Sequence, residues 1–353
     1  MNQNRYVFLD GIRGMAAIFI VINHTNNYWG FDLARNYLAV DLFFILSGFV
    51  IANAYDERIR SGIITFPKFM LVRLTRLYPV FLLSLLFFSA LTIYGVTKHP
   101  LPSTVLIEVA SSLALTALFL PSHIEGYNLL FPINPPCWSL FYELISNAIY
   151  AVIRPFLNNV ALAAIVISSG LILMGAYYHY EKPVNLGWQW SYESIIGGFI
   201  RSIFGIFMGL LIHRNHTFLK HRFSNKVSPW IAFAAVAIIL TSPDMGKFNW
   251  IIDAISVTVF FPLCVCFASL GNHTKLDKIL LMLGSASYPM YVLHTPILNL
   301  LNRVQIVDAS KFAPISGIAL VALLIALSVM IEKYFDIPVR KWITNKTLYK
   351  NKK

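Results

Sequence analysis

The stretch Leu9-Asp-Gly-Ile-Arg-Gly-Met-Ala-Ala-Ile-Phe-Ile-Val-Ile-Asn-His24 decides how this chain folds, because it is apolar enough to enter a lipid bilayer yet carries ionisable side chains. These are Asp10, Arg13 and His24. A charge at mid-membrane costs at least ~2.5 to 3.5 kcal/mol, so such residues are usually paired, exposed to a wet cavity, or functional. The stretch therefore predicts a membrane helix with a polar stripe.

Arg13 and His24 share that stripe. Eleven positions separate them, and at about 100° per residue eleven steps bring a helix back to within about 20° of its starting face. The rise of ~1.5 Å per residue places the two side chains about 16 Å apart along the helix axis. We therefore expect a cation low on one helix face and an imidazole high on the same face.

The composition of the whole chain is that of an integral membrane protein. Of the 353 residues, 57% are hydrophobic and 12% are charged, and the mean hydropathy is +0.66. In soluble domains about a quarter of the residues are charged. Lysine and arginine (28) exceed aspartate and glutamate (16), an excess that membrane proteins usually carry in cytoplasmic loops. No basic stretch with interleaved aromatic residues indicates a nucleic-acid partner, and the three cysteines lack the partners of a metal site.

Eleven apolar windows are candidates for membrane helices and predict an all-α, polytopic fold. They cover residues 7–29, 37–55, 79–96, 105–120, 138–153, 158–177, 194–213, 228–242, 249–270, 279–301 and 312–335. Three connections are clearly basic: 56–78, 214–226 and the C-terminal tail. Short loops rich in lysine and arginine stay in the cytoplasm, so we place all three there.

The number of crossings between the first two basic loops must be even, yet five windows separate them. The window 105–120 is the weakest, because it is short and contains Glu108, whereas a clean crossing needs ~20 apolar residues. We therefore expect about ten transmembrane helices with both termini in the cytoplasm. The chain is expected to form a single domain, 1–353, ending in a basic cytoplasmic tail, 337–353.

This topology places four ionisable side chains near the outer level of the membrane, each on a different helix: His24, Asp41, Glu143 and His294. A carboxylate beside His24 would set the tautomer of the imidazole and raise its basicity, as a general base requires. The alternative for His24 is a core histidine bonded to a neighbouring carbonyl group.

The arginine pair Arg73 and Arg76 lies at positions i and i+3 of an amphipathic segment, 66–78, expected at the inner membrane surface before Pro79 begins the next span. One interpretation is a basic patch for anionic lipid headgroups. The other is a clamp for the phosphates of a cytosolic donor, since the planar guanidinium group binds phosphate in a bidentate way.

Two later stretches carry further candidates. In the stretch Pro135-Pro-Cys-Trp-Ser-Leu-Phe-Tyr-Glu143, the acid follows the interfacial Trp138 within a membrane helix, so it is either paired or functional. In Ser287-Tyr-Pro-Met-Tyr-Val-Leu-His294, a proline opens the helix, and Tyr291 and His294 share one face. Transport proteins use broken helices as well, so this feature alone does not distinguish an enzyme from a transporter.

Taken together, these stretches resemble the acyltransferase 3 family of bacterial membrane acyltransferases over nearly the whole chain. The marks, in family order, are Leu9-Asp-Gly-Ile-Arg-Gly14 with His24, Val40-Asp-Leu-Phe-Phe-Ile-Leu-Ser-Gly-Phe49, Arg73-Leu-Thr-Arg-Leu-Tyr-Pro79, Trp138-Ser-Leu-Phe-Tyr-Glu143 and Ser287-Tyr-Pro-Met-Tyr-Val-Leu-His294. The resemblance implies about ten membrane helices, an acyl-coenzyme A donor taken from the cytoplasm, and transfer to a hydroxyl group, often on a surface polysaccharide. The chain ends at Lys353 without the esterase-like domain that some members carry, so the membrane part is expected to act alone or with a separate partner.

The resemblance also assigns roles to residues. Arg13 and His24 match the functional pair of the first helix, Arg73 and Arg76 the cytoplasmic arginine pair, and Glu143 the acid after Trp-Ser. We expect catalysis by His24, Asp41 and Glu143, and donor binding by Arg13, Arg73 and Arg76. Substrate contacts or support are expected from Asp10, Trp138, Ser139, Tyr291 and His294.

The expected reaction is acetyl transfer from acetyl-coenzyme A, as a co-substrate and without a metal, to a sugar hydroxyl group of a lipid-linked or nascent surface glycan, with lipopolysaccharide O-antigen as its specific form. The expected location is a bacterial inner membrane, with lipids as further partners; no feature of the sequence indicates an oligomeric state. The alternatives are another acyl group, such as succinyl, another acceptor, or a transporter of a lipid-linked sugar.

Overall fold

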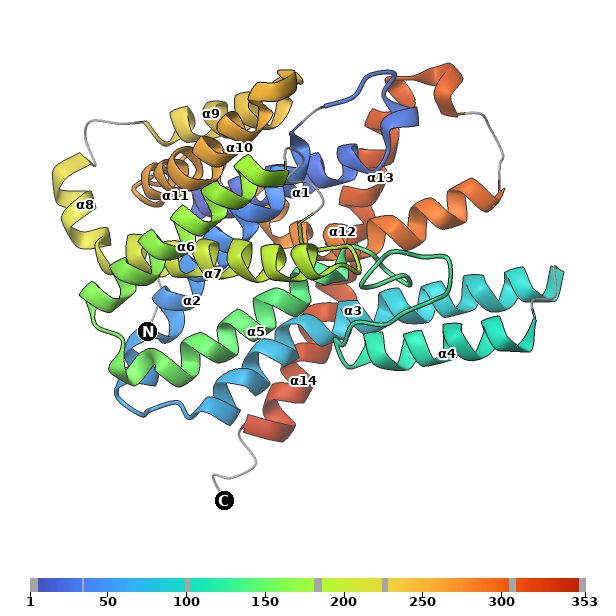
Figure 1. Ribbon diagram of the computed structural model, residues 1–353, viewed down its shortest axis with the longest axis horizontal. Coiled ribbons are helices and arrows are strands. Elements are labelled where there is room, and N and C mark those ends of the chain that lie inside the picture. Colours follow the sequence, from blue (N-terminus) through green and yellow to red (C-terminus); the bar gives the residue numbers. More distant parts are fainter. Residues whose placement is uncertain are drawn as a thin grey trace.

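The protein has an all-α fold, with helices and no strand in the described part of the chain, as the sequence predicts (Figure 1). The computed structural model describes residues 6–33, 35–98, 102–180, 186–223, 228–304 and 309–348. The α-helices are α1 (Val7–Asn23), α2 (Ala39–Arg60), α3 (Phe66–Lys98), α4 (Ser103–Ala117), α5 (Cys137–Ile153), α6 (Asn159–Tyr180), α7 (Tyr192–Arg214), α8 (His216–Phe223), α9 (Pro229–Thr241), α10 (Asn249–Ile255), α11 (Phe261–Ser269), α12 (Asp277–Val304), α13 (Ile315–Ile331) and α14 (Ile337–Leu348).

Helices occupy all eleven predicted windows, and in the described residues six of the helical segments are long and apolar enough to cross a membrane. The segments α4, with 15 residues, and α9, with 13, are shorter apolar helices. Figure 1 shows α4 lying alongside the second half of α3, with the pair projecting from the rest of the bundle. The expected count of about ten spans and the cytoplasmic placement of both termini stay predictions.

The centre of the bundle is the pair α2 and α7, whose backbones approach closely at glycines. A Cβ atom at Gly48 would lie 2.0 Å from the carbonyl oxygen of Ile206, and one at Gly209 would lie 2.2 Å from that of Ile45. Small residues allow this close approach, which stabilises helix pairs in lipid through van der Waals contact. The two glycines therefore set the distance between α2 and α7.

A second close pair joins α1 to α12, and here the glycines belong to the opening stretch of sequence. A Cβ atom at Gly14 would lie 2.4 Å from the Cβ atom of Leu283, and one at Gly284 would lie 2.5 Å from the Cβ atom of Asp10. The glycines of Asp10-Gly-Ile-Arg-Gly14 thus serve helix packing. They bring the polar stripe of α1 against α12.

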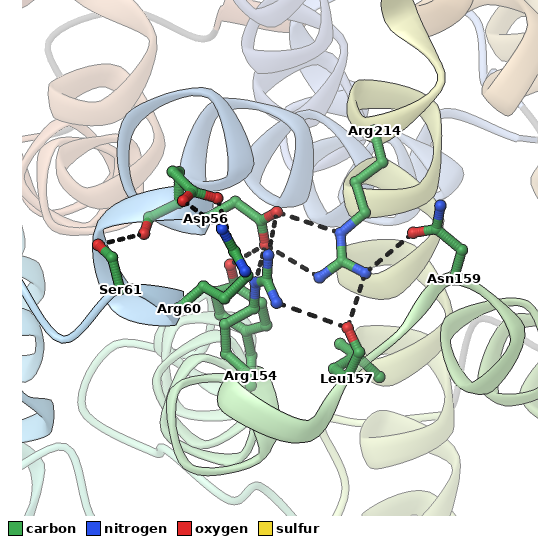
Figure 2. Close-up of polar contacts among 9 residues, drawn as sticks. Asp56, Arg60, Ser61, Arg154, Leu157, Asn159 and Arg214 are labelled. Atoms are coloured by element: carbon green, nitrogen blue, oxygen red, sulfur yellow. Dashed lines mark hydrogen bonds and ion pairs between the residues drawn. The ribbon is translucent and has the colours of Figure 1, made fainter.

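An ion-pair cluster joins the ends of α2, α5 and α7 on one side of the bundle (Figure 2). The carboxylate of Asp56 accepts hydrogen bonds from Arg154 at 2.8 Å, from Arg214 at 3.1 Å and from the hydroxyl group of Tyr150 at 2.6 Å. Arg214 also donates to the carbonyl oxygen of Leu157 at 3.0 Å. The basic connections after α2 and α7 therefore lie on the same side, as the parity argument requires; we call it the inner side.

One prediction about the start of a helix is wrong. The helix α3 runs unbroken from Phe66 to Lys98 with Pro79 inside it, so segment 66–78 is not a separate surface helix. A proline removes one helix hydrogen bond, and a membrane helix tolerates that loss where its neighbours bond the freed group.

The expected basic tail, 337–353, is helical in its described part. Residues up to Leu348 form α14, which continues α13 through a π-helical turn, η8 (Glu332–Asp336), and packs against α3. Pro338 lies directly after this turn, inside the continuous helix, and has no N–H to donate to it. Arg340 pairs with Asp336 one turn before it at 2.8 Å. Residues 349–353 lie outside the described residues.

The spacing of α2 and α7 can be tested by adding one methyl group. Gly209→Ala would place a Cβ atom within 2.2 Å of backbone, and such overpacking typically costs about 1 to 3 kcal/mol. We expect a lower thermal midpoint and less monodisperse protein, measured by size-exclusion chromatography of heated, detergent-solubilised samples. The matched control is Gly175→Ala in α6, where no atom lies within 4 Å of the added Cβ; an equal loss there would contradict the packing explanation.

Candidate active site

The polar stripe of α1 borders internal cavities at both of its ends. Arg13 lies in the wall of two of them. His24, directly after the last helical residue of α1, lies in the wall of two others. The stripe predicted from the eleven-residue spacing thus faces hollow space inside the bundle, where polar groups can meet water or a ligand.

The inner cavity has a volume of about 350 Å³ and is lined by charged side chains from α1, α3 and α14. Arg13 lies 3.4 Å from Asp10, and Arg340 lies 2.8 Å from Asp336. Arg76 is exposed, and among the described residues it has no ion-pair partner. Three guanidinium groups therefore surround one cavity, and that of Arg76 is available to an incoming anion.

A narrower cavity adjoins the inner cavity and shares Arg13 and Arg76 with it in its wall; we call it the passage. Its volume is about 90 Å³. A large part of the lining is apolar or aromatic: Val40, Phe43, Phe44, Val50, Leu77, Leu140, Tyr288 and Tyr291. The small volume and these apolar side chains suit a thin, flexible chain.

The passage also contains Arg73 and Glu143, which form an ion pair at 2.6 Å. Ser47 donates a second hydrogen bond to the same carboxylate oxygen at 2.6 Å. Arg73 is buried, whereas Arg76 is exposed, so the arginine pair expected to act together is divided between two environments. Arg73 compensates the charge of Glu143 within the bundle, and Arg76 faces the inner cavity.

An outer chamber of about 330 Å³ follows the passage and shares Val40 and Tyr291 with it. Its wall contains His24 and the aromatic side chains of Tyr37, Trp138 and Trp188. The hydroxyl group of Tyr291 bonds Ser139 at 2.7 Å and donates to the carbonyl oxygen of Pro136 at 2.9 Å, which fixes the boundary between passage and chamber. Inner cavity, passage and chamber therefore lie in series between Arg76 and His24.

The carboxylate of Asp41 is held by an arginine that the sequence analysis did not single out. Arg201 of α7 donates to its two oxygens at 2.9 and 2.7 Å, and both side chains are buried. The guanidinium group of Arg201 also lies 5.1 Å from the ring centre of Trp138. Asp41 thus neutralises a buried cation and positions one wall of the chamber.

The imidazole of His24 has a defined tautomer. Its Nδ1 atom lies 2.8 Å from the carbonyl oxygen of Ile20, which can only accept a hydrogen bond, so Nδ1 carries the proton and Nε2 is the basic nitrogen. The ring centre of His294 lies 4.9 Å away. His294 likewise bonds a carbonyl oxygen, that of Tyr291, through Nδ1 at 2.7 Å. Two imidazoles therefore lie side by side, each with its Nδ1 bonded to backbone; His24 lines the chamber, whereas His294 is buried behind it.

The four side chains expected near the outer level of the membrane, those of His24, Asp41, Glu143 and His294, do not form one cluster in the structure. His24 and His294 are neighbours, whereas among the described residues the carboxylates of Asp41 and Glu143 bond other partners. The expected orientation of His24 by a carboxylate is replaced by the bond to the Ile20 carbonyl group, because local helix geometry supplies an acceptor one turn back. Arg201 could have been singled out from the sequence, since it is an arginine within the apolar window 194–213 and a charge there needs a partner.

Arg340 and Asp336 were also given no role from the sequence, and only the packing of α14 on α3 shows that they line the inner cavity. Within the described residues, no group of three or more histidine, cysteine, aspartate or glutamate side chains could hold a metal ion.

Comparison with known proteins shows the family to which this chain belongs. A family model described as an acyltransferase domain matches residues 6–333. The chain belongs to the acyltransferase 3 family. It is similar to the O-acetyltransferase OatA of Staphylococcus aureus, with 26% identity over 365 residues, which cover 97% of this chain and 58% of that protein. It is also similar to "Protein 2 in picA locus" of Rhizobium radiobacter, with 44% identity over 156 residues, 42% of this chain and 81% of that protein.

The chain therefore spans little more than half the length of its OatA relative. No solved structure matches the chain. The family membership identifies this protein as a membrane acyltransferase, and its helical fold with six apolar segments long enough to cross a membrane, counted over the described ranges, agrees with that class.

The structure predicts that Asp41 stabilises this acyltransferase through Arg201. Asp41→Ala would leave a buried guanidinium group unpaired, which typically costs about 3 to 5 kcal/mol. We expect a large fall in the thermal midpoint of the purified protein, with much of the loss recovered when Arg201→Met accompanies Asp41→Leu. A single Asp41→Ala variant that melts like the wild type but has lost activity would instead support the catalytic role expected from the sequence.

Proposed function

We propose that this protein is a membrane O-acetyltransferase that takes acetyl-coenzyme A from the inner side and transfers the acetyl group to a sugar hydroxyl group of a surface polysaccharide on the outer side. The observation that carries this proposal is the series of inner cavity, narrow passage and outer chamber, which leads from Arg13 and Arg76 to His24. The OatA relative, named an O-acetyltransferase, supports the type of reaction.

Donor binding would use the inner cavity and the narrow passage. Arg76 and Arg13 would hold the phosphates, because a guanidinium group forms short, charge-assisted hydrogen bonds to phosphate oxygens. Arg340 would add a third cation when it exchanges Asp336 for a phosphate. The apolar lining of the passage would hold the pantetheine arm, so that the thioester enters the outer chamber.

At the outer chamber, His24 would act as general base. Its Nε2 atom would take the proton of the acceptor hydroxyl group as the hydroxyl oxygen attacks the thioester carbonyl carbon. The bond between carbon and sulfur then breaks, and His24 returns the proton to the leaving thiolate. General acid–base catalysis of this kind contributes typically ~10² to 10⁴-fold to the rate. An acyl-histidine intermediate is a variant of the same site, in which Nε2 attacks the thioester first.

The acceptor we propose is a lipid-linked or nascent surface glycan, with lipopolysaccharide O-antigen as its specific form, in a bacterial inner membrane with both termini in the cytoplasm. Support comes from the position of His24, since the chain would have to cross the membrane between the basic inner connections and this side chain. Trp138 and Trp188 line the chamber, where the thioester end of the donor would lie beside His24.

The role of His24 predicts the outcome of its removal. His24→Ala should keep its fold, because the side chain is exposed and makes one hydrogen bond within the described structure, to its own helix. We expect transfer to fall by at least ~10²-fold, measured as acetyl groups on purified surface polysaccharide by mass spectrometry. The matched control is His123→Ala, an exposed histidine of the connection between α4 and α5, for which normal transfer is expected.

The same preparation separates an enzyme from a transporter. Reconstituted wild-type protein should release free thiol from acetyl-coenzyme A, and the His24 variant should not. Thiol release at the background level from the wild type, together with movement of a lipid-linked sugar, would support a transporter. Normal glycan acetylation by the His24→Ala variant would rule out His24 as the general base.

The role of Arg76 predicts a selective defect in donor binding. Arg76→Ala should weaken the affinity for coenzyme A by at least about tenfold, because it removes the exposed guanidinium group of the inner cavity, which is worth about 1.5 to 3 kcal/mol when bonded to phosphate. Binding can be measured by isothermal titration calorimetry in nanodiscs at two salt concentrations. The matched control is Arg58→Ala, an exposed inner arginine outside the cavities described here, and equal losses for both variants would indicate a non-specific basic patch.

A further inference from the structure

A second polar hollow, apart from the outer chamber, also has His24 in its wall. This outer crevice has a volume of about 240 Å³, and its wall shares Asn23 and His24 with the outer chamber. The rest of its lining is polar apart from one leucine: Thr25, Asn26, Asn27, Tyr28, Leu298 and Asn302. His24 therefore lies in the wall of two spaces: the outer chamber, and a crevice formed by the first turn after α1 and the end of α12.

The amide groups of this crevice are free to bind a ligand. Asn26, Asn27 and Asn302 are exposed, and their side chains make no hydrogen bond to any other residue of the described ranges. Each amide offers two donors and an acceptor, a combination that matches neighbouring hydroxyl groups, which also donate and accept. The lining contains no aspartate, glutamate, lysine or arginine. The crevice thus favours an uncharged, hydroxyl-rich group over a phosphate or a carboxylate.

The turn that carries two of these amides is held in place by its own packing. Thr25 donates to the carbonyl oxygen of Val21 at 2.8 Å and accepts from the indole N–H of Trp29 at 2.9 Å. The indole packs against α13, where a Cβ atom at Gly317 would lie 2.6 Å from the ring. Ser316 donates to the carbonyl oxygen of Tyr28 at 3.1 Å. Figure 1 shows this connection from α1 to α2 lying beside α13.

We infer that the outer crevice is the acceptor subsite and that it takes a neutral sugar residue of the polysaccharide. This inference rests on the proposed acetyl transfer and adds where the acceptor binds. The chamber would be filled by the thioester end of the donor, so the attacking hydroxyl group has to reach His24 from another direction, and the crevice supplies that direction. The amides of Asn27 and Asn302 would bind hydroxyl groups beside the one that is acetylated.

The test uses the full chain in nanodiscs, with acetyl-coenzyme A and non-acetylated polysaccharide extracted from a strain that lacks the gene. The variants are Asn27→Ala, Asn302→Ala and the double variant, with Asn128→Ala as the matched control. Asn128 is an exposed asparagine of the connection between α4 and α5 and does not line the crevice. Two readouts are needed: acetyl transfer as a function of polysaccharide concentration, and the slow release of thiol without polysaccharide, in which water replaces the acceptor hydroxyl group and acetate is the second product.

We expect the KM for polysaccharide to rise about tenfold in the double variant, since each lost hydrogen bond between uncharged groups typically weakens binding by about two- to tenfold. Thiol release without polysaccharide should stay within twofold of the wild type, and Asn128→Ala should match the wild type in both readouts. An unchanged KM in the double variant overturns the inference, and so does an equal loss of thiol release and transfer. Failure of the proposed function looks different, because then the wild type itself transfers no acetyl group, and both proposals fall together.

Discussion

The structure depends on one constraint, that a charge inside an apolar bundle needs a partner of opposite sign. Asp41 pairs with Arg201, and Arg35 pairs with Asp253 at 3.0 Å, each pair buried and each joining segments more than 150 residues apart. Asp56 holds two arginines on the inner side. Removing one member of such a pair leaves an uncompensated charge, which is far more costly than losing both. These pairs therefore specify which helices lie together.

The same constraint distinguishes polar residues that are compensated inside the bundle from those that are available to a ligand. Asp41 and Glu143 lie in the middle of conspicuous motifs, yet their oxygens bond Arg201 and Arg73, so their charges are compensated within the bundle. His24 and Arg76 are exposed at the cavities, and their side chains bond no other side chain within the described residues. An available hydrogen-bonding group beside hollow space is what a ligand requires.

The glycines complement the ion pairs. In α1 they let the helix lie against α12, and this contact brings His24 within 4.9 Å of His294 and the lower half of the stripe beside the inner cavity. The motif Asp10-Gly-Ile-Arg-Gly14 is thus partly a packing motif and partly a chemical one. Arg13 and Asp10 place charges at the inner cavity, whereas Gly14 allows the close approach of α1 to α12.

The sequence by itself determined the helical membrane class, the position of the apolar segments and the stripe from Arg13 to His24, because hydrophobicity and helical period are local properties that tertiary packing does not alter. It also singled out the residues too polar for lipid. Only the tertiary structure decided their partners. Spacing along the chain cannot show that Arg201 rather than His24 meets Asp41, that Arg340 turns into the inner cavity, or that Asn302 completes a crevice with Asn27, since each depends on which helices pack side by side.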